Sequence, residues 1–428
     1  MRVVRIPVHG FVEVDGVSER VLDSPEMQRL RRVRQLGLAD LVYPGATHVR
    51  LEHSLGVKCL CDRVLEIHWE RLRRDVPEVG RFSREYVEEV LGLAGLLHDV
   101  GHPPFSHVPE PLLEEELGVD HEDIGAAVAR VVLEREDVMD VEAVLETAFG
   151  PGKGWTRMLH QIIAGDLGVD RLDYLVRDSL HAGVEYGRIE LDRVLHTLEL
   201  GERITVHWKG VEAAESVLVA RYHMYRTVYF HKTCRAGDAM LLRAIRLAVD
   251  DGHLDLGAFD PDRLLRKENA RAAFLEMDDC RLLHELMEHP EARELVEGLR
   301  ARRLYKCVAE YKAAEEPSHG ELIRWAEEVS EEHLGDPNGV LLDSSKIVPY
   351  DPSSEGVIVR TEEGQVPLSE VSDLVRTLKE RAEREIPTLR VYVRPEVRED
   401  REMVRRVVED VRSLVPPARD IRYGSRND

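Results

Sequence analysis

Helical periodicity over most of the chain restricts the fold more than any other feature of the sequence. From about residue 23 to about residue 330, apolar residues recur three or four positions apart, as on the buried face of an amphipathic helix. Ser24 and Pro25 are typical of a helix start, because serine caps the first turn and proline suits the first helical position, and Gly37 is expected to end this helix. Further helices are expected after His53 and over residues 84–99, 155–182 and 213–250.

The pattern changes at residues 335–339, a Gly-Asp-Pro-Asn-Gly cluster that is typical of a turn. Beyond this cluster, short apolar runs typical of strands alternate with helical stretches. Strands are expected at residues 340–342, 356–360 and 389–393 and helices at 369–384 and 400–413, with further short strands at 3–7, 11–14 and 204–208. We therefore predict a mainly α protein, with a helical domain over residues 1–330 and a smaller α/β appendage over residues 335–428.

Charge and composition exclude several classes of protein. The formal net charge is −23, whereas a general binder of nucleic acid or of anionic membranes needs basic surfaces. No run of 18 or more apolar residues is present, and residues 1–11 lack the apolar run and cleavage site of a signal peptide. The five scattered cysteines do not form a disulfide framework. We expect a cytoplasmic protein with no membrane partner and no general nucleic-acid binding.

Histidines gather in one part of the sequence, where seven of the nineteen lie between residues 48 and 121. Adjacent His98 and Asp99 would lie about 100° apart on a helix, so they can converge on one ion only where Gly101 ends the helix. Two imidazoles and two carboxylates suit a divalent metal with positions left open for water and substrate. His53 is a candidate for the second imidazole, and the second carboxylate is expected from a later helix.

The helix around residues 169–178 supplies such a carboxylate on a polar face. Asp170, Arg171, Tyr174 and Asp178 fall within about 100° of one another on the helical wheel. This face combines a metal ligand, a cation for phosphate, an aromatic ring and an acceptor; a solvated charged face is the alternative. A later helix is expected to carry a similar combination on one face, formed by Arg221, Tyr225, Tyr229 and Lys232. Tyrosines at this spacing are more often core residues.

Taken in order, these motifs resemble those of the HD-domain deoxynucleoside triphosphate triphosphohydrolases, a family that includes sterile-alpha-motif and HD-domain dNTPases and prokaryotic HD phosphohydrolases. The resemblance covers roughly residues 1–310 and rests on segments 43–48, 50–56, 98–107 and 170–178. It implies an HD-domain helical core at about residues 48–182. It also implies an enzyme that cleaves a deoxynucleoside triphosphate to a deoxynucleoside and tripolyphosphate.

Carried over by position, the resemblance assigns a role to each matching residue. One divalent ion (Fe, Mn, Mg, Zn, Ni or Co) is expected on His53, His98, Asp99 and Asp170. His121 is expected to protonate the leaving sugar oxygen, Glu110 to orient it, and His102 and His107 to contact phosphate. Substrate contacts are expected from Gln35, Leu36, Arg50, Arg171, Tyr174, Asp178, Arg221, Tyr225 and Tyr229. Tyr225 and Phe230 depart from the animal enzyme, which leaves the base preference open.

The resemblance also implies regulation by a guanine nucleotide or a deoxynucleotide. The matching residues are Arg2, Asp23, Gln28 and Arg31 for the guanine site and Lys209, Lys232, Arg302 and Lys306 for an adjoining site between subunits. Such a site would make the protein a homodimer or a homotetramer. Without the resemblance, residues 29–34 are only a basic helix face.

Two other functions stay open on the sequence alone. An HD phosphodiesterase acting on cyclic or oligomeric nucleotides would share the metal site. A nucleotide-sensing or single-strand-binding scaffold without catalysis is the second alternative. The expected sugar contacts of Gln35, Tyr174 and Asp178 favour a triphosphate substrate, and the negative net charge disfavours the scaffold.

Overall fold

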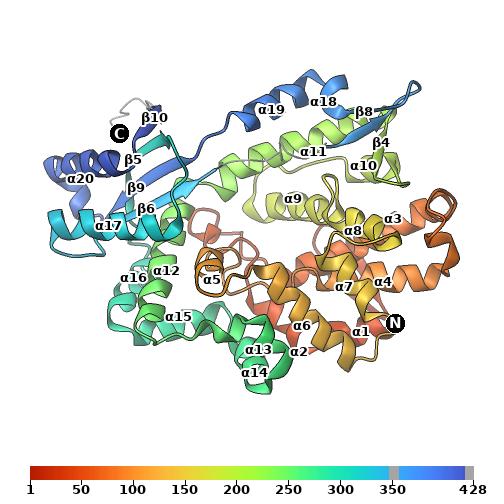
Figure 1. Cartoon of the computed structure of the whole chain (residues 1–428), viewed down its shortest axis with the longest axis horizontal. Helices are drawn as coiled ribbons and strands as arrows, with labels where there is room; N and C mark the ends of the chain where they lie inside the picture. The colour runs from red at the N-terminus through yellow and green to blue at the C-terminus, as the bar shows by residue number, and fades with distance from the viewer. Residues whose placement is uncertain (347–355, 420–428) are drawn as a thin grey trace. The chain divides into compact units, whose positions relative to one another are not determined.

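The structure is a computed structural model that describes residues 1–346 and 356–419 (Figure 1). It contains two compact units, each built from separate stretches of chain. The first unit comprises Met1–Met224, Leu256–Leu282 and Pro349–Glu380, and the second comprises Tyr225–Asp255, Leu283–Val348 and Arg381–Asp428. Helices dominate the described residues, so the expectation of a mainly α protein is confirmed.

The first unit is predominantly helical. Its helices are α1 (Gly16–Leu22), α2 (Pro25–Arg29), α3 (Arg50–Asp75), α4 (Arg84–Leu97), α5 (Glu110–Leu117), α6 (His121–Arg135), α7 (Val141–Phe149), α8 (Trp155–Ala164), α9 (Val169–Ala182), α10 (Leu191–Thr197), α11 (Val211–Met224), α13 (Pro261–Arg266), α14 (Glu268–Glu276) and α18 (Leu368–Val371). Two helices begin in this unit and end in the second, α15 (Asp279–Glu288) and α19 (Asp373–Glu383).

Two small sheets accompany these helices. An antiparallel hairpin joins β1 (Arg2–Ile6) to β2 (Gly10–Val14). The second sheet has the order β3 (Leu198–Glu199), β4 (Thr205–His207), β7 (Ile358–Arg360) and β8 (Gln365–Pro367). The parallel pairing of β4 with β7 brings residues after 356 into the first unit. The two units therefore do not divide at residues 330–335. The expected domains, residues 1–330 and 335–428, stay a prediction.

The helix that begins at Pro25 is shorter than its sequence suggests. Ser24 caps it as expected, with its Oγ accepting from the backbone amide of Met27, but α2 ends at Arg29 and a single 3-10 turn follows. The expected end at Gly37 is wrong. Arg29 is fully buried and donates to the carbonyl oxygens of Met277 and His102, so tertiary contacts override the local pattern.

Three other expected helices also begin or break differently. The helix after His53 already starts at Arg50, which places His53 in its first turn. The helix expected over 155–182 breaks into α8 and α9 at a turn between Gly165 and Gly168. The helix expected over 213–250 divides into α11, a π-helical turn at Tyr225–Tyr229, and α12 (Lys232–Asp250).

The second unit combines a sheet with helices. Its strand order is β10 (Pro417–Arg419), β5 (Lys306–Ala313), β9 (Thr388–Val393) and β6 (Val340–Ser345), with every pairing antiparallel. The accompanying helices are α12, α16 (Pro290–Arg300), α17 (His319–Leu334) and α20 (Arg401–Leu414). Helices α17 and α20 accompany this sheet (Figure 1). Their apolar side chains pack with strand residues such as Tyr311 and Val391. The α/β composition expected of the C-terminal part is present, but β5 was not foreseen.

Close packing of helices positions the histidine motif of the first unit. A Cβ atom on Gly56 of α3 would lie 2.0 Å from Oδ1 of Asp173 on α9, so only glycine allows these helices to approach this closely. A Cβ atom on Gly101 would lie 2.2 Å from the amide nitrogen of Gly125 on α6. The turn that follows α4 is thereby held against the N-terminal end of α6.

Candidate active site

Three expected metal ligands converge from three different helices. His53 lies in the first turn of α3, His98 follows the last residue of α4, and Asp170 lies in the first turn of α9. Nε2 of His53 is 2.9 Å from Oδ1 of Asp170 and 3.2 Å from Nε2 of His98. One ligand atom from each residue can lie within 4.8 Å of the others, so the three can share one ion.

Asp99, the fourth expected ligand, adjoins this group. Its carboxylate oxygens lie 3.4 Å from Nε2 of His98 and 3.7 Å from Nε2 of His53. Arg50 donates from Nη1 to Oδ2 of Asp99 at 2.6 Å. Burial alone would raise the pKa of Asp99, but the positive charge of Arg50 and the nearby histidines hold that pKa well below its usual range. Asp99 is therefore an anion in a buried position.

The hydrogen bonds of the two histidines test whether this group suits a metal ion. Nδ1 of His98 lies 2.9 Å from the carbonyl oxygen of Gly95, and Nδ1 of His53 lies 2.7 Å from Oδ2 of Asp173. A carbonyl and a carboxylate can only accept, so each Nδ1 carries a proton and each ring turns its Nε2 toward the other. Two Nε2 atoms 3.2 Å apart beside two carboxylates form a donor set that fits a divalent metal.

The electrostatics of His53 express the same requirement. Burial lowers its pKa, but hydrogen bonds to Asp170 and Asp173 outweigh burial and raise the pKa of His53 to about 10. The carboxylates thus favour positive charge at this point. A proton on an Nε2 atom or a bound cation can supply that charge.

Sequence reasoning missed Asp173, which hydrogen-bonds Nδ1 of His53, and the residues that in turn hydrogen-bond Asp173. Asp173 accepts from His53, from His9 at 2.6 Å and from Arg177 at 2.8 and 2.9 Å, and its side chain is fully buried. The i, i+4 spacing of Asp173 and Arg177 on α9 is a local signal that could have revealed this pair. No local signal links His9 to Asp173, because the two are separated by 164 positions.

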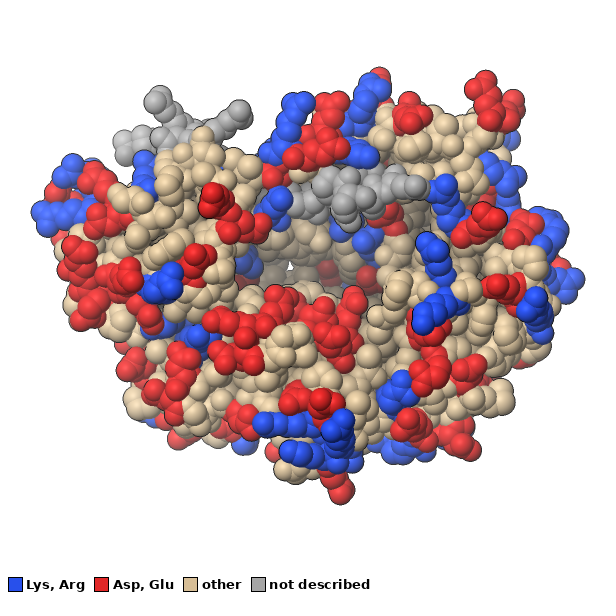
Figure 2. Space-filling model, viewed as in Figure 1, with Lys and Arg blue, Asp and Glu red and all other residues tan. Residues whose placement is uncertain are grey.

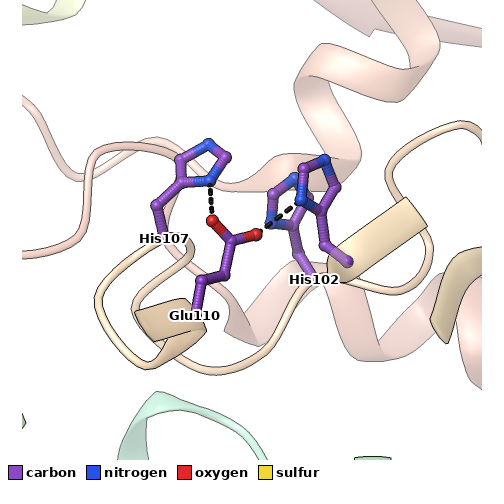
Figure 3. Close-up of side chains that lie close together, drawn as sticks. His102, His107 and Glu110 are labelled. Carbon is purple, nitrogen blue, oxygen red and sulfur yellow. Dashed lines mark hydrogen bonds and ion pairs between the residues drawn. The ribbon is translucent and has the colours of Figure 1, made fainter. Parts of the chain in front are cut away.

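A second cluster joins the four residues expected to act in catalysis. Glu110, the first residue of α5, contacts Nδ1 of His107 at 2.6 Å through Oε2 and Nδ1 of His121 at 2.5 Å through Oε1. The ring of His102 stacks on that of His121 at a centroid distance of 4.0 Å. Figure 3 shows the Glu110 carboxylate between His107 on one side and the stacked rings, His102 among them, on the other. These groups could also hold a metal ion.

Glu110 and His121 form a charged pair. Burial opposes both charges, but the hydrogen bonds between them raise the pKa of His121, and those from His107 and His121 lower the pKa of Glu110. Asp120 caps α6 and fixes its first residue, His121, by accepting from the amides of Glu122 and Asp123. The pair with Glu110 therefore favours the imidazolium form of His121 at the start of the helix.

Arg50 and His102 connect the two clusters. Besides Asp99, the guanidinium of Arg50 contacts Oγ of Ser106 at 2.8 Å and lies 3.5 Å from Nε2 of His107. Nε2 of His102 lies 3.2 Å from Oδ1 of Asp99. The site is thus one continuous array of imidazoles, carboxylates and a buried guanidinium.

The expected substrate residues fall into separate groups. Gln35 is buried, and its Oε1 has no hydrogen-bond donor among the described residues. Asp178 is buried against His48, and the ring of Tyr174 meets that of His53 edge-on at 6.5 Å. Arg171 is tied to Gly165 and Asp166 in the loop before α9. Leu36 is half-buried, Arg221 lies on α11 of the first unit, and Tyr225 and Tyr229 belong to the second unit.

The expected activator residues are also distributed over both units. Arg2 forms a two-point ion pair with Asp23, and Nε of Arg31 donates to Oε1 of Gln28 at 2.7 Å. Lys209 lies in the 3-10 turn after β4, with its amine 5.3 Å from the ring centroid of Trp208. Lys232, Arg302 and Lys306 belong to the second unit.

The charge of the surface and the apolar character of the helices bear on two classes of partner, nucleic acids and membranes. On the face drawn in Figure 2, basic side chains are mixed with acidic ones instead of forming one basic stripe. Among the described helices, none combines the length and the apolar character needed to cross a membrane.

Comparisons with known proteins show which family the chain belongs to. The HD domain matches residues 50–178, and the HD associated region matches residues 189–420. The uncharacterized protein MJ1154 of Methanocaldococcus jannaschii is 34% identical over 305 residues, which cover 70% of this chain and 59% of that protein. The deoxynucleoside triphosphate triphosphohydrolase SAMHD1 of Bos taurus is 28% identical over 359 residues, which cover 72% of this chain and 59% of that enzyme. The chain therefore spans less than two thirds of the length of these relatives.

A solved structure extends the similarity over nearly the whole chain. The phosphohydrolase BT4208 from Bacteroides thetaiotaomicron superposes with a TM-score of 0.73 at 28% sequence identity. The match covers 92% of this chain and all of that one.

Proposed function

The chain belongs to the HD-domain phosphohydrolase family, and from that premise we propose that it cleaves deoxynucleoside triphosphates to a deoxynucleoside and tripolyphosphate. The observation that carries this proposal is the continuity of the two clusters through Arg50 and His102. A metal-binding group, phosphate-binding cations and a general acid thus lie side by side. This is the combination that transfer of a phosphoryl group to water requires.

We assign one divalent ion to His53, His98, Asp99 and Asp170. The facing Nε2 atoms and the two carboxylates support this assignment. When bound, such an ion polarises phosphate and activates water for attack. All other steps of the mechanism are assigned to side chains of the chain itself.

Buried Arg50 balances the negative charge of the triphosphate. Its guanidinium already adjoins Asp99 and His107, so a phosphate oxygen near these residues would gain a charge-assisted hydrogen bond. His102 and His107 supply further contacts, and Arg171 and Arg221 are the remaining candidates for phosphate binding. Low exposure strengthens the interactions of Arg50 and His102.

His121 is the proposed general acid. Glu110 stabilises the charged form of His121 and raises its pKa, which favours a proton held for the departing sugar oxygen. Glu110 keeps Nδ1 occupied, so the proton that His121 gives up is the one on Nε2. Protonation at this point turns an alkoxide leaving group into an alcohol.

Gln35 and Asp178 support the choice of a deoxyribose. The buried Oε1 of Gln35 has no donor among the described residues, and a sugar 3′-hydroxyl would satisfy it. If Tyr174 stacks on the sugar and Leu36 lies beneath its second carbon, a 2′-hydroxyl would have no room and no partner. Burying an unpaired hydroxyl costs about 1–3 kcal/mol, which corresponds to roughly a 5- to 150-fold preference for the deoxynucleotide.

We extend the proposal to activation by a guanine nucleotide. Arg2 pairs with Asp23 and Arg31 with Gln28, and a bound nucleotide would exchange these contacts for its phosphates and its guanine edge. Activation through this site and through Lys209, Lys232, Arg302 and Lys306 would go together with assembly into a homodimer or homotetramer. Light scattering and activity assays with and without GTP test both parts.

The decisive assay offers each of the four deoxynucleoside triphosphates to the metal-loaded protein, with and without GTP, and separates the products by chromatography. We expect deoxynucleoside and tripolyphosphate. Activity only on cyclic or oligomeric nucleotides would replace this proposal by a phosphodiesterase. Binding without turnover of any nucleotide would favour a nucleotide-sensing scaffold.

A further inference from the structure

His9 lies at the turn of the N-terminal hairpin, outside the residues that match the HD domain, yet its side chain is almost completely buried. It is 2% exposed, and its Nε2 lies 2.6 Å from Oδ1 of Asp173. The preceding Val8 has a φ of 72°, a left-handed conformation that is unusual for a β-branched residue. Such strain persists where surrounding contacts fix it, and the buried contact of His9 is one of these.

Asp173 receives a complete set of hydrogen bonds. Oδ2 accepts from Nδ1 of His53 and from Nε of Arg177, while Oδ1 accepts from His9 and from Nη2 of Arg177. Gly56 closes off the remaining space, since a Cβ atom there would lie 2.0 Å from Oδ1. His9 therefore supplies one of two donors to the oxygen that does not face His53.

This arrangement determines how His53 is oriented. A carboxylate that loses a donor on one oxygen turns toward its remaining donors, and Arg177 contacts both oxygens. Such a turn alters the hydrogen bond that holds the proton on Nδ1 of His53 and directs Nε2 toward His98 and Asp170. Partners of this kind, which orient a metal-ligating histidine, commonly affect metal affinity by about 10–100-fold.

We propose that His9 is a positioning residue for the metal site, so that the N-terminal hairpin completes the surroundings of the ligand His53 through Asp173. The inference rests on the metal site assigned above. It predicts that the HD core needs the hairpin to bind its ion tightly, although none of the four assigned ligands belongs to the hairpin.

The test is a Co²⁺ titration of the metal-free full-length protein, followed by visible absorption, which reports both affinity and ligand geometry. His9→Leu removes the donor at similar volume and should weaken Co²⁺ binding by about 10–100-fold, with a changed spectrum. His9→Gln can still donate to Asp173 and should restore most of the affinity.

His68→Leu is the matched control. His68 is a buried histidine of α3 whose Nε2 lies 2.8 Å from the carbonyl oxygen of Leu195, with no link to the metal group. Its replacement should lower thermal stability and leave Co²⁺ affinity unchanged.

The outcomes separate the two proposals. If the wild type and Asp170→Ala bind Co²⁺ equally, the metal site itself is wrong. If the wild type binds one ion that depends on Asp170, but His9→Leu binds as tightly with the same spectrum, the role of His9 is refuted. Equal weakening in His9→Leu and His68→Leu also refutes it. If His9→Leu fails to fold, His9→Asn replaces it, because the shorter Asn side chain holds its amide farther from Asp173 than Gln does. Equal Co²⁺ affinities of the Asn and Gln variants would then overturn the inference.

Discussion

Two glycines on neighbouring helices of the first unit should respond to alanine in opposite ways. Gly56 of α3 faces Asp173 and Arg177, where a Cβ atom would lie 2.0 Å from Oδ1 and 2.4 Å from Nη2. Gly92 of α4 has its nearest neighbours at 3.7–3.9 Å, which is ordinary van der Waals contact. Both positions are helical, so alanine improves helix propensity equally at each.

Gly56→Ala should be strongly destabilising. To reach an ordinary contact distance, Asp173 must retreat by more than an ångström, and its hydrogen bonds to His53 and His9 are then too long to persist. Breaking a buried charged network costs about 3–5 kcal/mol, well above the gain of about 1 kcal/mol from helix propensity. Gly92→Ala should be neutral or stabilise the protein by up to about 1 kcal/mol.

Urea unfolding followed by circular dichroism measures both variants, and elemental analysis measures the metal that they retain. We expect Gly56→Ala to lose both stability and bound metal, and Gly92→Ala to retain both. A Gly56→Ala protein with wild-type stability and metal content would refute the close approach of α3 and α9 and the network built on it.

Three further predictions concern individual residues of the site. Asp170→Ala should reduce bound metal from about one ion per chain to nearly none, as measured by elemental analysis, and full retention would contradict its role as a ligand. Glu110→Gln removes the anion that raises the pKa of His121, so the alkaline limb of the kcat/KM profile should move to lower pH. A charged hydrogen bond worth roughly 1.5–3 kcal/mol corresponds to a move of about 1–2 pH units. An unshifted alkaline limb would show that protonated His121 is not the acid. Asp279 accepts from the amides of Phe105 and Arg34. Asp279→Asn should therefore loosen the segment that carries His102 and His107, and it should lower kcat more than it raises KM. An unchanged kcat in steady-state assays would count against this.

The metal group was foreseen because its signal is local. His98 and Asp99 are adjacent, the turn at Gly101 follows at once, and the polar face of α9 is visible in its spacing. The order of the motifs supplied His53, which lies beside His98 and Asp170, and it supplied Glu110 and His121, which contact each other. The chemistry of each residue in the array could thus be anticipated, although its assigned role remains a proposal.

Features that depend on long-range contacts were not foreseen. Arg29 looks like part of a basic helix face, yet it is buried below Phe274 and ends α2 through its tertiary bonds. The pairing of residues 206 and 359 assigns the strand expected at 356–360 to a sheet of the first unit. The contact of His9 with Asp173 belongs to the same class, because hydrophobic periodicity carries no information about a buried polar contact.

The central claim is that water attacks the α-phosphorus of a deoxynucleoside triphosphate and releases tripolyphosphate in one step. Hydrolysis of dGTP in water enriched in heavy oxygen, with the products analysed by mass spectrometry, tests this claim directly. The account predicts deoxyguanosine without label and tripolyphosphate with one labelled oxygen. In His121→Ala the same reaction should run at no more than about one hundredth of the wild-type rate. Label-free tripolyphosphate, or deoxyguanosine monophosphate with pyrophosphate as the products, would contradict it.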